Sequence, residues 1–275
     1  MSLKILTLNV WNHGGPYQKR LELIRGWIRQ LQPDVIGFQE IFVKDGYNQA
    51  KEIMEGHDYY LEEVQSFQWD DFVLSNAVAS RWPITSSEKH YLPRSDEPDI
   101  RAALCVSIGA PFGSIGFIVT HLHWKPTGSQ LRVTQARELC ALIEKEKDRH
   151  AFPPILVGDF NAVPDSDEIR LIKGLPAPKG KSYPLLDAWE VAGDPKTAGA
   201  TFSNRNAYLQ KESSPDRRFD YIFVGSATPD GLGKVETCRV VCDQEQAGVW
   251  PSDHFGVYAE LRIDPFTAPT ATTVR

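Results

Sequence analysis

The chain has 275 residues, of which 41% are hydrophobic and 24% are charged, and its formal net charge at pH 7 is −6. This is the composition of an ordinary globular protein with an ample core. The negative charge argues against a broad nucleic-acid-binding surface, although a local basic groove is compatible with it. The cysteines lie among apolar neighbours without the spacing of a zinc site, so we expect reduced thiols in the core: Cys105, Cys140, Cys238 and Cys242.

The beginning of the sequence carries no targeting signal that we recognise. A predicted strand starts almost at once, and no signal peptide or long apolar span is visible. We therefore expect a cytoplasmic protein without a transmembrane segment, and we infer no obligate protein partner.

The first elements alternate between strand and helix. Leu3 to Val10 is a predicted strand with Asn9 at its end, and Gln18 to Gln32 is a predicted helix with its apolar residues on one stripe. A proline ends this helix, and the next predicted strand, Asp34 to Phe38, runs into Glu40. Further along we expect a helix at 47–54, a turn at 80–84, and strands at 57–64, 72–79, 88–92, 101–108 and 115–121.

The same order of strand, helix and proline-led strand then occurs again. Gly116 to Leu122 is a predicted strand, Gln130 to about Lys147 is a predicted helix, and the next apolar strand ends at Asp159. One unit ends at Glu40 and the other at Asp159, which suggests two similar halves whose functional ends converge. Strand-helix-strand units are common, so chance could also produce this repetition.

The second of these units ends in an unusual way. Ile155 to Val157 is a continuous apolar run, as expected of a strand buried on both faces. Asp159 and Asn161 follow two residues apart, so in an extended chain their side chains point the same way. Burying a carboxylate is costly unless it is paired, metal-bound or catalytic, which favours a site. The same residues are also good turn formers, so this stretch alone leaves turn and site equally open.

The last part of the chain contains a predicted helix at 168–172, short elements at 185–189 and 201–203, and strands at 219–224, 235–241 and 255–263. Residues 204–218 are polar, and we expect an exposed loop with local positive charge from Arg205, Lys211, Arg217 and Arg218. Residues 265–275 are rich in threonine, alanine and proline, which predicts a flexible tail. Because no linker is visible, we expect residues 1–264 to form one domain.

Polar side chains stand at six strand ends or in the turns beside them: Asn9, Glu40, His121, Asp159 with Asn161, Asp220, and Asp253 with His254. Each has a purely structural explanation. Asp220, for example, could pair with Arg217 or Arg218, and a single strand histidine is more often a satisfied core residue than a ligand. Six polar strand ends in a chain with two similar halves favour one shared site over six unrelated structural roles.

Seven short motifs carry a resemblance to a known family: Thr7-Leu-Asn-Val10, Gln39-Glu40, Ser80-Arg-Trp-Pro-Ile84, Thr120-His-Leu122, Gly158-Asp-Phe-Asn161, Arg218-Phe-Asp-Tyr-Ile222 and Ser252-Asp-His254. In this order the chain resembles the endonuclease/exonuclease/phosphatase superfamily of metal-dependent phosphoesterases, which includes pancreatic-type deoxyribonucleases, abasic-site endonucleases and neutral sphingomyelinases. The resemblance implies a four-layer α/β sandwich of two mostly antiparallel sheets flanked by helices, with the site at one end.

The resemblance also implies hydrolysis of a phosphate ester by metal-assisted attack of water on phosphorus. Glu40 is the implied principal ligand of one or two Mg²⁺ or Mn²⁺ ions, supported by Asp253 and Asn9. All the candidate ligands are oxygens, which favours these ions over structural zinc. Asp159 would orient or deprotonate the attacking water, and Asn161 would hold that water or a phosphate oxygen.

The remaining implied roles concern proton transfer and phosphate binding. His254, polarised by Asp220, would transfer a proton or stabilise the phosphate. His121 would donate to a non-bridging phosphate oxygen, and Arg101 is a further expected phosphate contact. The sequence leaves open which of Asp159 and His254 is the general base.

The substrate is a phosphate ester whose class the sequence leaves open: a small molecule, a lipid headgroup or a nucleic acid. We favour a phosphodiesterase with a small or lipid-headgroup substrate, because a nuclease is expected to carry a basic groove with aromatic residues. A nuclease is second, a sphingomyelinase-like lipid phosphodiesterase is a rival, and a non-catalytic binding module is a remote alternative.

Overall fold

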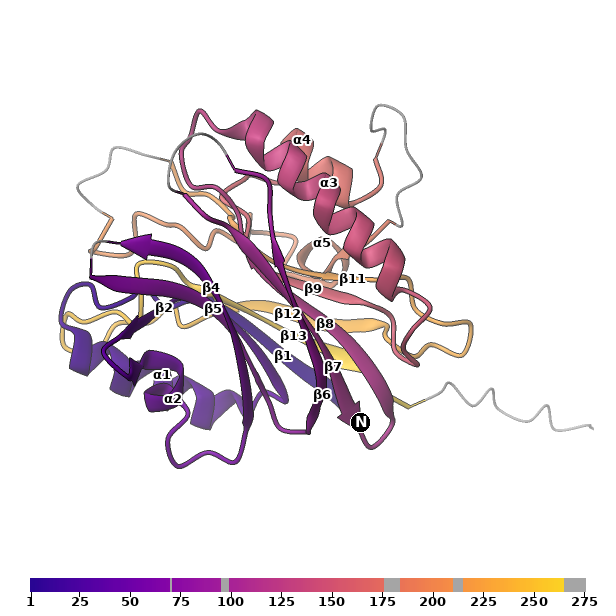
Figure 1. The fold of residues 1–275 in the computed structure, drawn as a ribbon, viewed down its shortest axis with the longest axis horizontal. Coiled ribbons are helices and arrows are strands. Elements are labelled where there is room, and N and C mark those ends of the chain that lie inside the picture. The colour runs from indigo at the N-terminus through magenta and orange to yellow at the C-terminus, as the bar shows by residue number, and fades with distance from the viewer. Residues whose placement is uncertain (70, 95–98, 176–183, 210–214, 265–275) are drawn as a thin grey trace, which may run out of the picture.

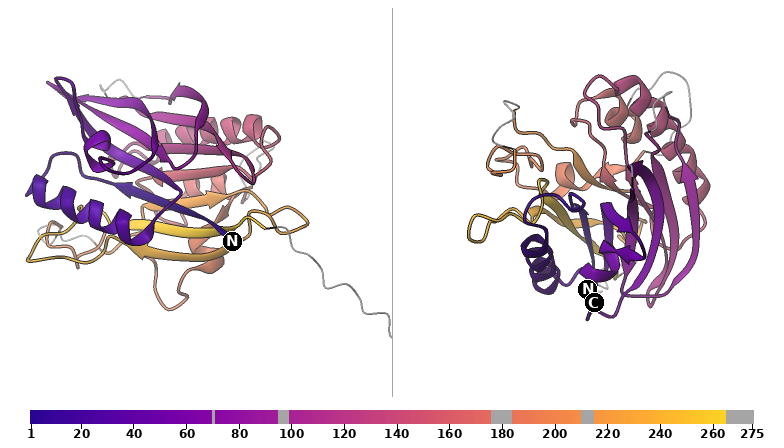
Figure 2. Two further views of the ribbon diagram at one scale, coloured as in Figure 1. Left: turned by 90° about the horizontal axis from the view of Figure 1, so that it is seen from below. Right: turned by 60° about the vertical axis from the view of Figure 1, so that its left-hand side comes forward.

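The computed structural model describes residues 1–69, 71–94, 99–175, 184–209 and 215–264. In these residues two mixed sheets pack face to face, and helices cover the outer face of each (Figures 1 and 2). The first sheet has the strand order β12 (Val235–Val241), β13 (Gly256–Arg262), β1 (Ser2–Asn9), β2 (Val35–Lys44), β5 (Phe72–Ser80) and β4 (Tyr60–Trp69), with β3 (Tyr47–Asn48) attached to β2. The second has the order β10 (Leu186–Asp187), β11 (Asp220–Val224), β9 (Ile155–Asp159), β8 (Gly113–His121), β7 (Ala102–Ala110) and β6 (Ile84–Tyr91).

The helices complete the four layers. Figure 1 shows α1 (Tyr17–Leu31) and α2 (Gln49–Ile53) on the outside of the first sheet. On the outside of the second lie α3 (Ser129–Glu146) and α4 (Asp167–Ile172), while α5 (Ala188–Ala192) packs against β11 and β12. The α/β sandwich expected from the sequence is therefore confirmed.

Strand alternation divides the buried apolar residues among three cores. Ile5 and Val157 belong to the core between the sheets, Leu6 to the core under α1, and Leu156 to the core under α3. The two sheets approach each other closely at Gly37 of β2, where an added Cβ would lie 2.4 Å from Val157 Cγ2. Only glycine fits this close approach.

The repeated strand-helix-strand unit is present in both sheets. β1 pairs in parallel with β2 across α1, and β8 pairs in parallel with β9 across α3, whereas the other strand pairs are antiparallel. The register places Asn9 opposite Gln39 in the first pair and His121 opposite Asp159 in the second. Both pairs therefore end with polar residues side by side.

Some element boundaries differ from the prediction. β2 continues to Lys44 because a bulge lets the strand keep pairing with β5 beyond Phe38. The helix expected at 47–54 is β3 followed by α2, and Asn48 caps α2 by accepting a hydrogen bond from the Lys51 N–H. The strands expected at 57–64 and 88–92 are β4 and β6, which begin at Tyr60 and Ile84.

The polar segment 204–218 was expected to be an exposed loop, and for three described residues, Asn206, Leu209 and Arg218, this is wrong. Arg218 is buried and donates from Nη1 to Asp187 Oδ2 over 2.5 Å. Asn206 is also buried, and its amide donates to the carbonyls of Ser252 and Asp253. Both side chains are stable inside because buried partners accept their hydrogen bonds. Lys211 and the expected tail at 265–275 lie outside the described residues.

Two further expectations concern the thiols and the membrane. All four cysteines are buried thiols, as expected, and no disulfide joins them. In the part of the chain that the structure describes, no helix has the length and apolar character needed to cross a membrane.

Candidate active site

The candidate site lies at one end of the space between the two sheets. Alternate residues of β1, β8, β9 and β11 fill the inner core, for example Ile5, Val119, Val157 and Ile222. The same alternation continues to the strand ends, where the inward positions are polar: Asn9, His121, Asp159 and Asp220. Because these strands lie side by side at their ends, the four polar groups converge.

Glu40 reaches this end only because β2 contains a β-bulge. Phe38 pairs with Ala77 and Ile41 with Ser75, so two residues of β2 stand where β5 has one. Phe38 and Ile41 both belong to the core under α1. Simple alternation would turn Glu40 toward that helix layer as well, and the bulge redirects it toward the site.

Several site residues have backbone conformations that are rare for non-glycine residues. The φ angles are 53° at Trp11, 35° at Asn12, 57° at Glu40 and 49° at Asn161. Left-handed backbone at residues other than glycine carries strain, and such strain clusters at functional sites because the surrounding structure must hold it. Four of the eight such residues in the described chain lie at this end of the sandwich, which agrees with a site there.

Asn9 connects the two carboxylates of the site. Its Nδ2 donates to Glu40 Oε1 and to Asp159 Oδ2, each over 3.1 Å. Its Oδ1 accepts from the backbone N–H of Trp11 over 3.0 Å, which fixes the orientation of the amide. In this arrangement Asn9 orients both carboxylates, and its oxygen is engaged by the backbone.

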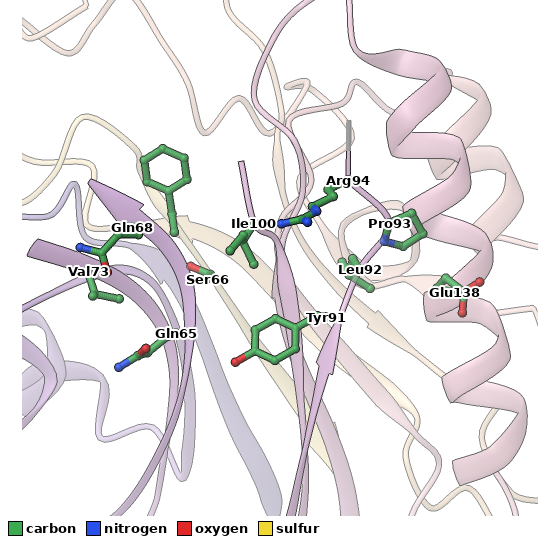
Figure 3. Close-up of a pocket in the computed structure, with 11 residues that line it drawn as sticks. Gln65, Ser66, Gln68, Val73, Tyr91, Leu92, Pro93, Arg94, Ile100 and Glu138 are labelled. Atoms are coloured by element: carbon green, nitrogen blue, oxygen red, sulfur yellow. The ribbon is translucent and has the colours of Figure 1, made fainter. Parts of the chain in front are cut away.

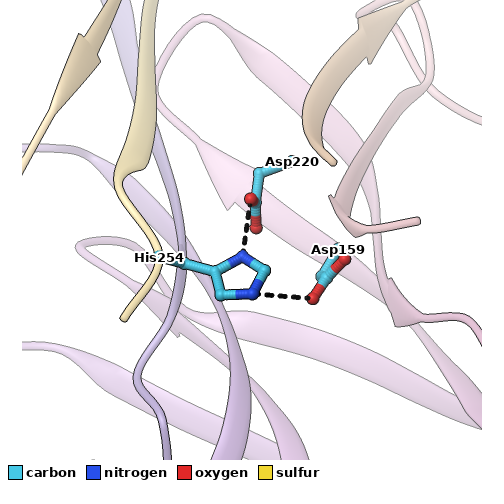
Figure 4. Close-up of side chains that lie close together, drawn as sticks. All are labelled: Asp159, Asp220 and His254. Atoms are coloured by element: carbon cyan, nitrogen blue, oxygen red, sulfur yellow. Dashed lines mark hydrogen bonds and ion pairs between the residues drawn. The ribbon is translucent and has the colours of Figure 1, made fainter. Parts of the chain in front are cut away.

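His254 lies between two buried aspartates (Figure 4). Its Nδ1 donates to Asp220 Oδ2 over 2.9 Å, and its Nε2 lies 3.8 Å from Asp159 Oδ2. The other oxygen of Asp220 is buried without a hydrogen-bond partner. The ion pair with Arg217 or Arg218 that the sequence left open does not form, because Arg218 pairs with Asp187.

Burial and neighbouring charges shift the protonation of these groups. Burial alone would lower the pKa of His254, but the carboxylates of Asp220 and Asp159 raise it well above the usual range. Burial raises the pKa of Asp159 to about 7, and the His254 charge only partly offsets this effect. An imidazolium thus faces a carboxyl group that is poised to exchange a proton near neutral pH.

His121 and Asn161 form the opposite wall. Burial lowers the pKa of His121 well below its usual value, and the charges of Arg101 and His254 lower it further. The neutral ring accepts at Nε2 from Asn161 Nδ2 over 3.0 Å, while the Asn161 backbone N–H donates to Asp159 Oδ1 over 2.9 Å. A donor role of His121 toward phosphate, as the resemblance implies, would require Asn161 to release this nitrogen.

A cavity of about 570 Å³ opens beside these groups. Polar and apolar residues line it: Asn12, His13, Glu40, Phe67, Phe72, Leu74, Arg101, His121 and Trp124. Arg101 is only 6% exposed, yet it lines the cavity, and its role as a phosphate contact stays a prediction. Sequence reasoning missed Asn12, which donates from Nδ2 to Glu40 Oε2 over 2.8 Å, because Asn12 stands in a turn-rich stretch.

Two groups of side chains offer donor atoms for a divalent cation. Burial raises the pKa of Asp253 to about 6, and the neighbouring charge of Glu40 adds to this rise while that of His254 opposes it. A hard cation between Glu40 and Asp253 would relieve this repulsion. Among the described residues, ligand atoms of Asp159, Asp220 and His254 also lie within 4.8 Å of one another. There, however, the His254 ring already occupies the space between the carboxylates, so Glu40 and Asp253 fit the ion better.

Solved structures of other proteins share the fold of this chain. Among solved structures, TDP2 from D. rerio complexed with single-strand DNA product is 21% identical, with a TM-score of 0.73 over 95% of this chain and 99% of that one. An endonuclease/exonuclease/phosphatase from Bacteroides vulgatus is 19% identical, with a TM-score of 0.72 over 96% and 100% of the two chains. A family protein from Bacteroides thetaiotaomicron is 22% identical, with a TM-score of 0.73 over 95% of each chain.

These likenesses establish the fold. No curated protein matches the sequence. The model of the Endonuclease/Exonuclease/phosphatase family matches residues 6–254, which include all the polar strand ends described above. Membership of this family supports a phosphoesterase or nuclease activity. By sequence and by fold, the chain belongs to the endonuclease/exonuclease/phosphatase family.

Proposed function

We propose that this protein is a Mg²⁺- or Mn²⁺-dependent phosphodiesterase that hydrolyses its substrate by attack of water on phosphorus. The observation that carries the proposal is the buried pair of His254 and Asp159. It lies beside His121, which lines the cavity together with Glu40 and Arg101. Such a site brings together a cation, a carboxyl group with a pKa of about 7, and a carboxylate that fits a hard metal ion. Phosphoryl transfer needs all three.

The residues divide the work according to their charge. Glu40 and Asp253 would hold the ion, which would supply Lewis acidity at the phosphate, and Asn9 orients Glu40 and Asp159. Asp159 would take the proton of the attacking water. His254 stays protonated beside Asp220 and would stabilise negative charge on the phosphate oxygens. Asn161 and Arg101 would bind non-bridging oxygens.

The cavities favour a substrate with an apolar or aromatic group beside the phosphate. A second pocket of about 620 Å³ shares Phe67 with the catalytic cavity. Figure 3 shows it between β4 and β5 on one side and the end of β6 with α3 on the other, with Tyr91 and Leu92 along the wall. Apolar side chains provide much of the lining in both pockets, so we infer a phosphodiester with a bulky apolar substituent.

Nuclease activity on single strands is the second candidate. Tyr91 and Trp124 are 64% and 53% exposed, and each lines one of the two joined pockets. Exposed aromatic rings beside a phosphate site can stack nucleobases, each worth about 1–3 kcal/mol. The fold likeness to TDP2, solved with a single-strand DNA product, agrees with this candidate.

Hydrolysis of a substrate panel tests the proposal. The panel contains an aryl phosphodiester, sphingomyelin, a phosphoinositide, plasmid DNA and a single-stranded oligonucleotide, each with Mg²⁺, Mn²⁺ or chelator. We expect chelator-sensitive turnover that His254→Ala abolishes. Preference for the lipid or aryl esters supports the phosphodiesterase, and preference for the oligonucleotide, reduced by Tyr91→Ala, supports the nuclease. Normal rates in His254→Ala and Glu40→Ala would contradict the site, and silence across the panel would favour a binding module.

A further inference from the structure

Arg101, just before β7, is held at one nitrogen and open at two. Its Nε donates to Asp99 Oδ1 over 2.7 Å. Among the described residues, this is the hydrogen bond that the guanidinium makes. Neither Nη is a buried atom that lacks a hydrogen-bond partner, so both are accessible to solvent. Because Arg101 lines the catalytic cavity, the two Nη groups are the part of the fork that an oxygen anion in that cavity would meet.

Asp99 joins Arg101 to a second buried side chain. Its other oxygen, Oδ2, accepts a hydrogen bond from His123 Nδ1. The exposed fractions of Asp99, Arg101 and His123 are 4%, 6% and 4%. A carboxylate in such surroundings is stable only with partners on both oxygens, so neither contact of Asp99 is incidental.

His123 is itself fixed from several directions. Its backbone N–H donates to Gln135 Oε1 over 3.1 Å, and its carbonyl accepts from Arg132 Nη1 over 3.1 Å. Arg132 in turn donates from Nε to the buried Glu168 over 2.7 Å. At Gly128 an added Cβ would lie 2.2 Å from His123 Cδ2, so the absence of a side chain at Gly128 makes space for this ring.

We propose that Asp99, braced by His123, is a positioning residue that sets the Arg101 fork toward the substrate phosphate. The inference rests on the proposed function, since Arg101 needs an anionic ligand in the cavity. An unrestrained arginine side chain would lose its rotamer freedom on binding phosphate, whereas a guanidinium held at Nε has already lost it. Neither Asp99 nor His123 stands at one of the polar strand ends from which the sequence predicts the site.

A purely structural role for Asp99 makes a different prediction. If Asp99 only compensates the buried charge of Arg101, its loss lowers the free energy of unfolding but leaves kcat, KM and phosphate affinity of the folded protein unchanged. If Asp99 acts through Arg101, loss of Asp99 lowers turnover and phosphate affinity only while Arg101 is present. A double-mutant cycle separates the two.

The experiment uses the full chain with Mg²⁺ and measures kcat and KM on the best phosphodiester of the panel, together with the affinity for inorganic phosphate. The variants are Asp99→Asn, Arg101→Met, the double variant, and His123→Gln. Loss of an outer hydrogen-bond partner lowers activity by about 10- to 100-fold in comparable sites. We expect Asp99→Asn to lower activity by this factor in the wild-type background, but by less than about twofold in the Arg101→Met background. The loss caused by His123→Gln should lie between these two values.

Asp34→Asn provides the matched control, because Asp34 also holds an arginine Nε, that of Arg81, over 3.1 Å, but lines a different pocket. We expect it to leave kcat, KM and phosphate affinity unchanged in both backgrounds. Circular dichroism and thermal unfolding establish that each variant folds, and guanidinium added to Arg101→Met should restore part of the rate.

The outcomes distinguish this inference from the proposed function. Additive losses from Asp99→Asn and Arg101→Met, with hydrolysis intact in the wild type, would overturn the positioning role and leave the function standing. No hydrolysis, with the two variants still coupled in phosphate affinity, would overturn the function and support the positioning role. Absence of both hydrolysis and phosphate binding would overturn the positioning role, because Arg101 would then face no anion site.

Discussion

His254 donates from Nδ1 to Oδ2 of Asp220 over 2.9 Å in a buried environment, where each group stabilises the charge of the other. Asp220 begins β11, and His254 lies just before β13 in the opposite sheet. The pair therefore joins the two sheets at the end of the sandwich. It fixes which imidazole nitrogen faces Asp159, and thus which nitrogen is available to a substrate.

Asp220→Asn should lower kcat by on the order of 10²- to 10⁴-fold while the protein stays folded, because the charge that keeps His254 protonated is lost and the shape is kept. Steady-state kinetics and circular dichroism measure the two effects. Asp243→Asn is the control, since Asp243 pairs with the exposed Arg205 over 2.9 Å. Equal rates for the Asp220 and Asp243 variants would remove Asp220 from the mechanism.

Metal addition should stabilise the folded protein through Glu40 and Asp253. A ligand at 100 times its Kd stabilises by about 2.7 kcal/mol, so Mg²⁺ or Mn²⁺ should raise Tm by several degrees, and chelator should reverse the rise. Thermal unfolding of the wild type and of Glu40→Gln measures this effect. If Tm rises equally in Glu40→Gln, the ion binds elsewhere. If the rise in Tm is lost only in His254→Ala, the ion binds at the cluster of Asp159, Asp220 and His254.

Two glycine substitutions should change stability in opposite directions. Gly158 has a φ of 151°, and an added Cβ would lie 2.0 Å from the Thr120 carbonyl oxygen, so Gly158→Ala should cost more than about 2 kcal/mol. Gly26 lies within α1 with nothing within 4 Å of its added Cβ, so Gly26→Ala should stabilise by about 0.5–1 kcal/mol. Urea unfolding measures both, and two changes of the same sign would contradict the local geometry.

Arg20 should be required for both stability and turnover. It is buried, and it donates to the carbonyls of Val10, Trp11, Asn12, Gly14 and Pro251. These segments carry Asn12 on one side and lead into Asp253 on the other. Arg20→Met leaves several carbonyls without donors, so we expect a loss of at least about 3 kcal/mol and a lower kcat.

Arg20→Lys serves as the comparison for this prediction. Lysine keeps the charge but offers fewer donors without the planar fork, so its stability should lie between wild type and Arg20→Met. Denaturant unfolding orders the three proteins. A lysine variant equal to wild type would mean that the charge of Arg20 matters and its hydrogen bonds do not.

The buried thiols should make the protein less stable in mild alkali. Burial raises the pKa of Cys105 and of Cys238 from 9.0 to about 12 each. The folded state therefore keeps both protons while the unfolded chain loses them, and stability falls as pH rises above 9. The fall approaches about 1.4 kcal/mol per pH unit and per thiol.

Unfolding between pH 8 and 9, where unfolded tyrosines are still mostly protonated, measures the onset of this slope. Replacing both Cys105 and Cys238 with alanine should reduce it. Alkylation at pH 8.5 should label neither residue until denaturant is added. Rapid labelling of the native protein would show that these side chains are accessible.

The sequence by itself determined most of the elements and indicated the family to which the chain belongs. Apolar runs broken by proline placed β1, β2, β8 and β9, because buried parallel strands need continuous apolar residues. The repeated unit also predicted that the polar strand ends converge, and the structure brings Asn9, His121 and Asp159 together at one end of the sandwich. The apolar runs are local properties, so they can be read from neighbouring residues.

Only the tertiary structure decided how distant residues meet. The bulge that turns Glu40 toward the site depends on the pairing of β2 with β5, and strict alternation would predict the opposite face. The same holds for Arg218, which finds Asp187 instead of Asp220, and for Asp99, which joins Arg101 to His123. A buried charge is stabilised by whichever partner the packing brings within a few ångströms, and sequence separation carries no information about that distance.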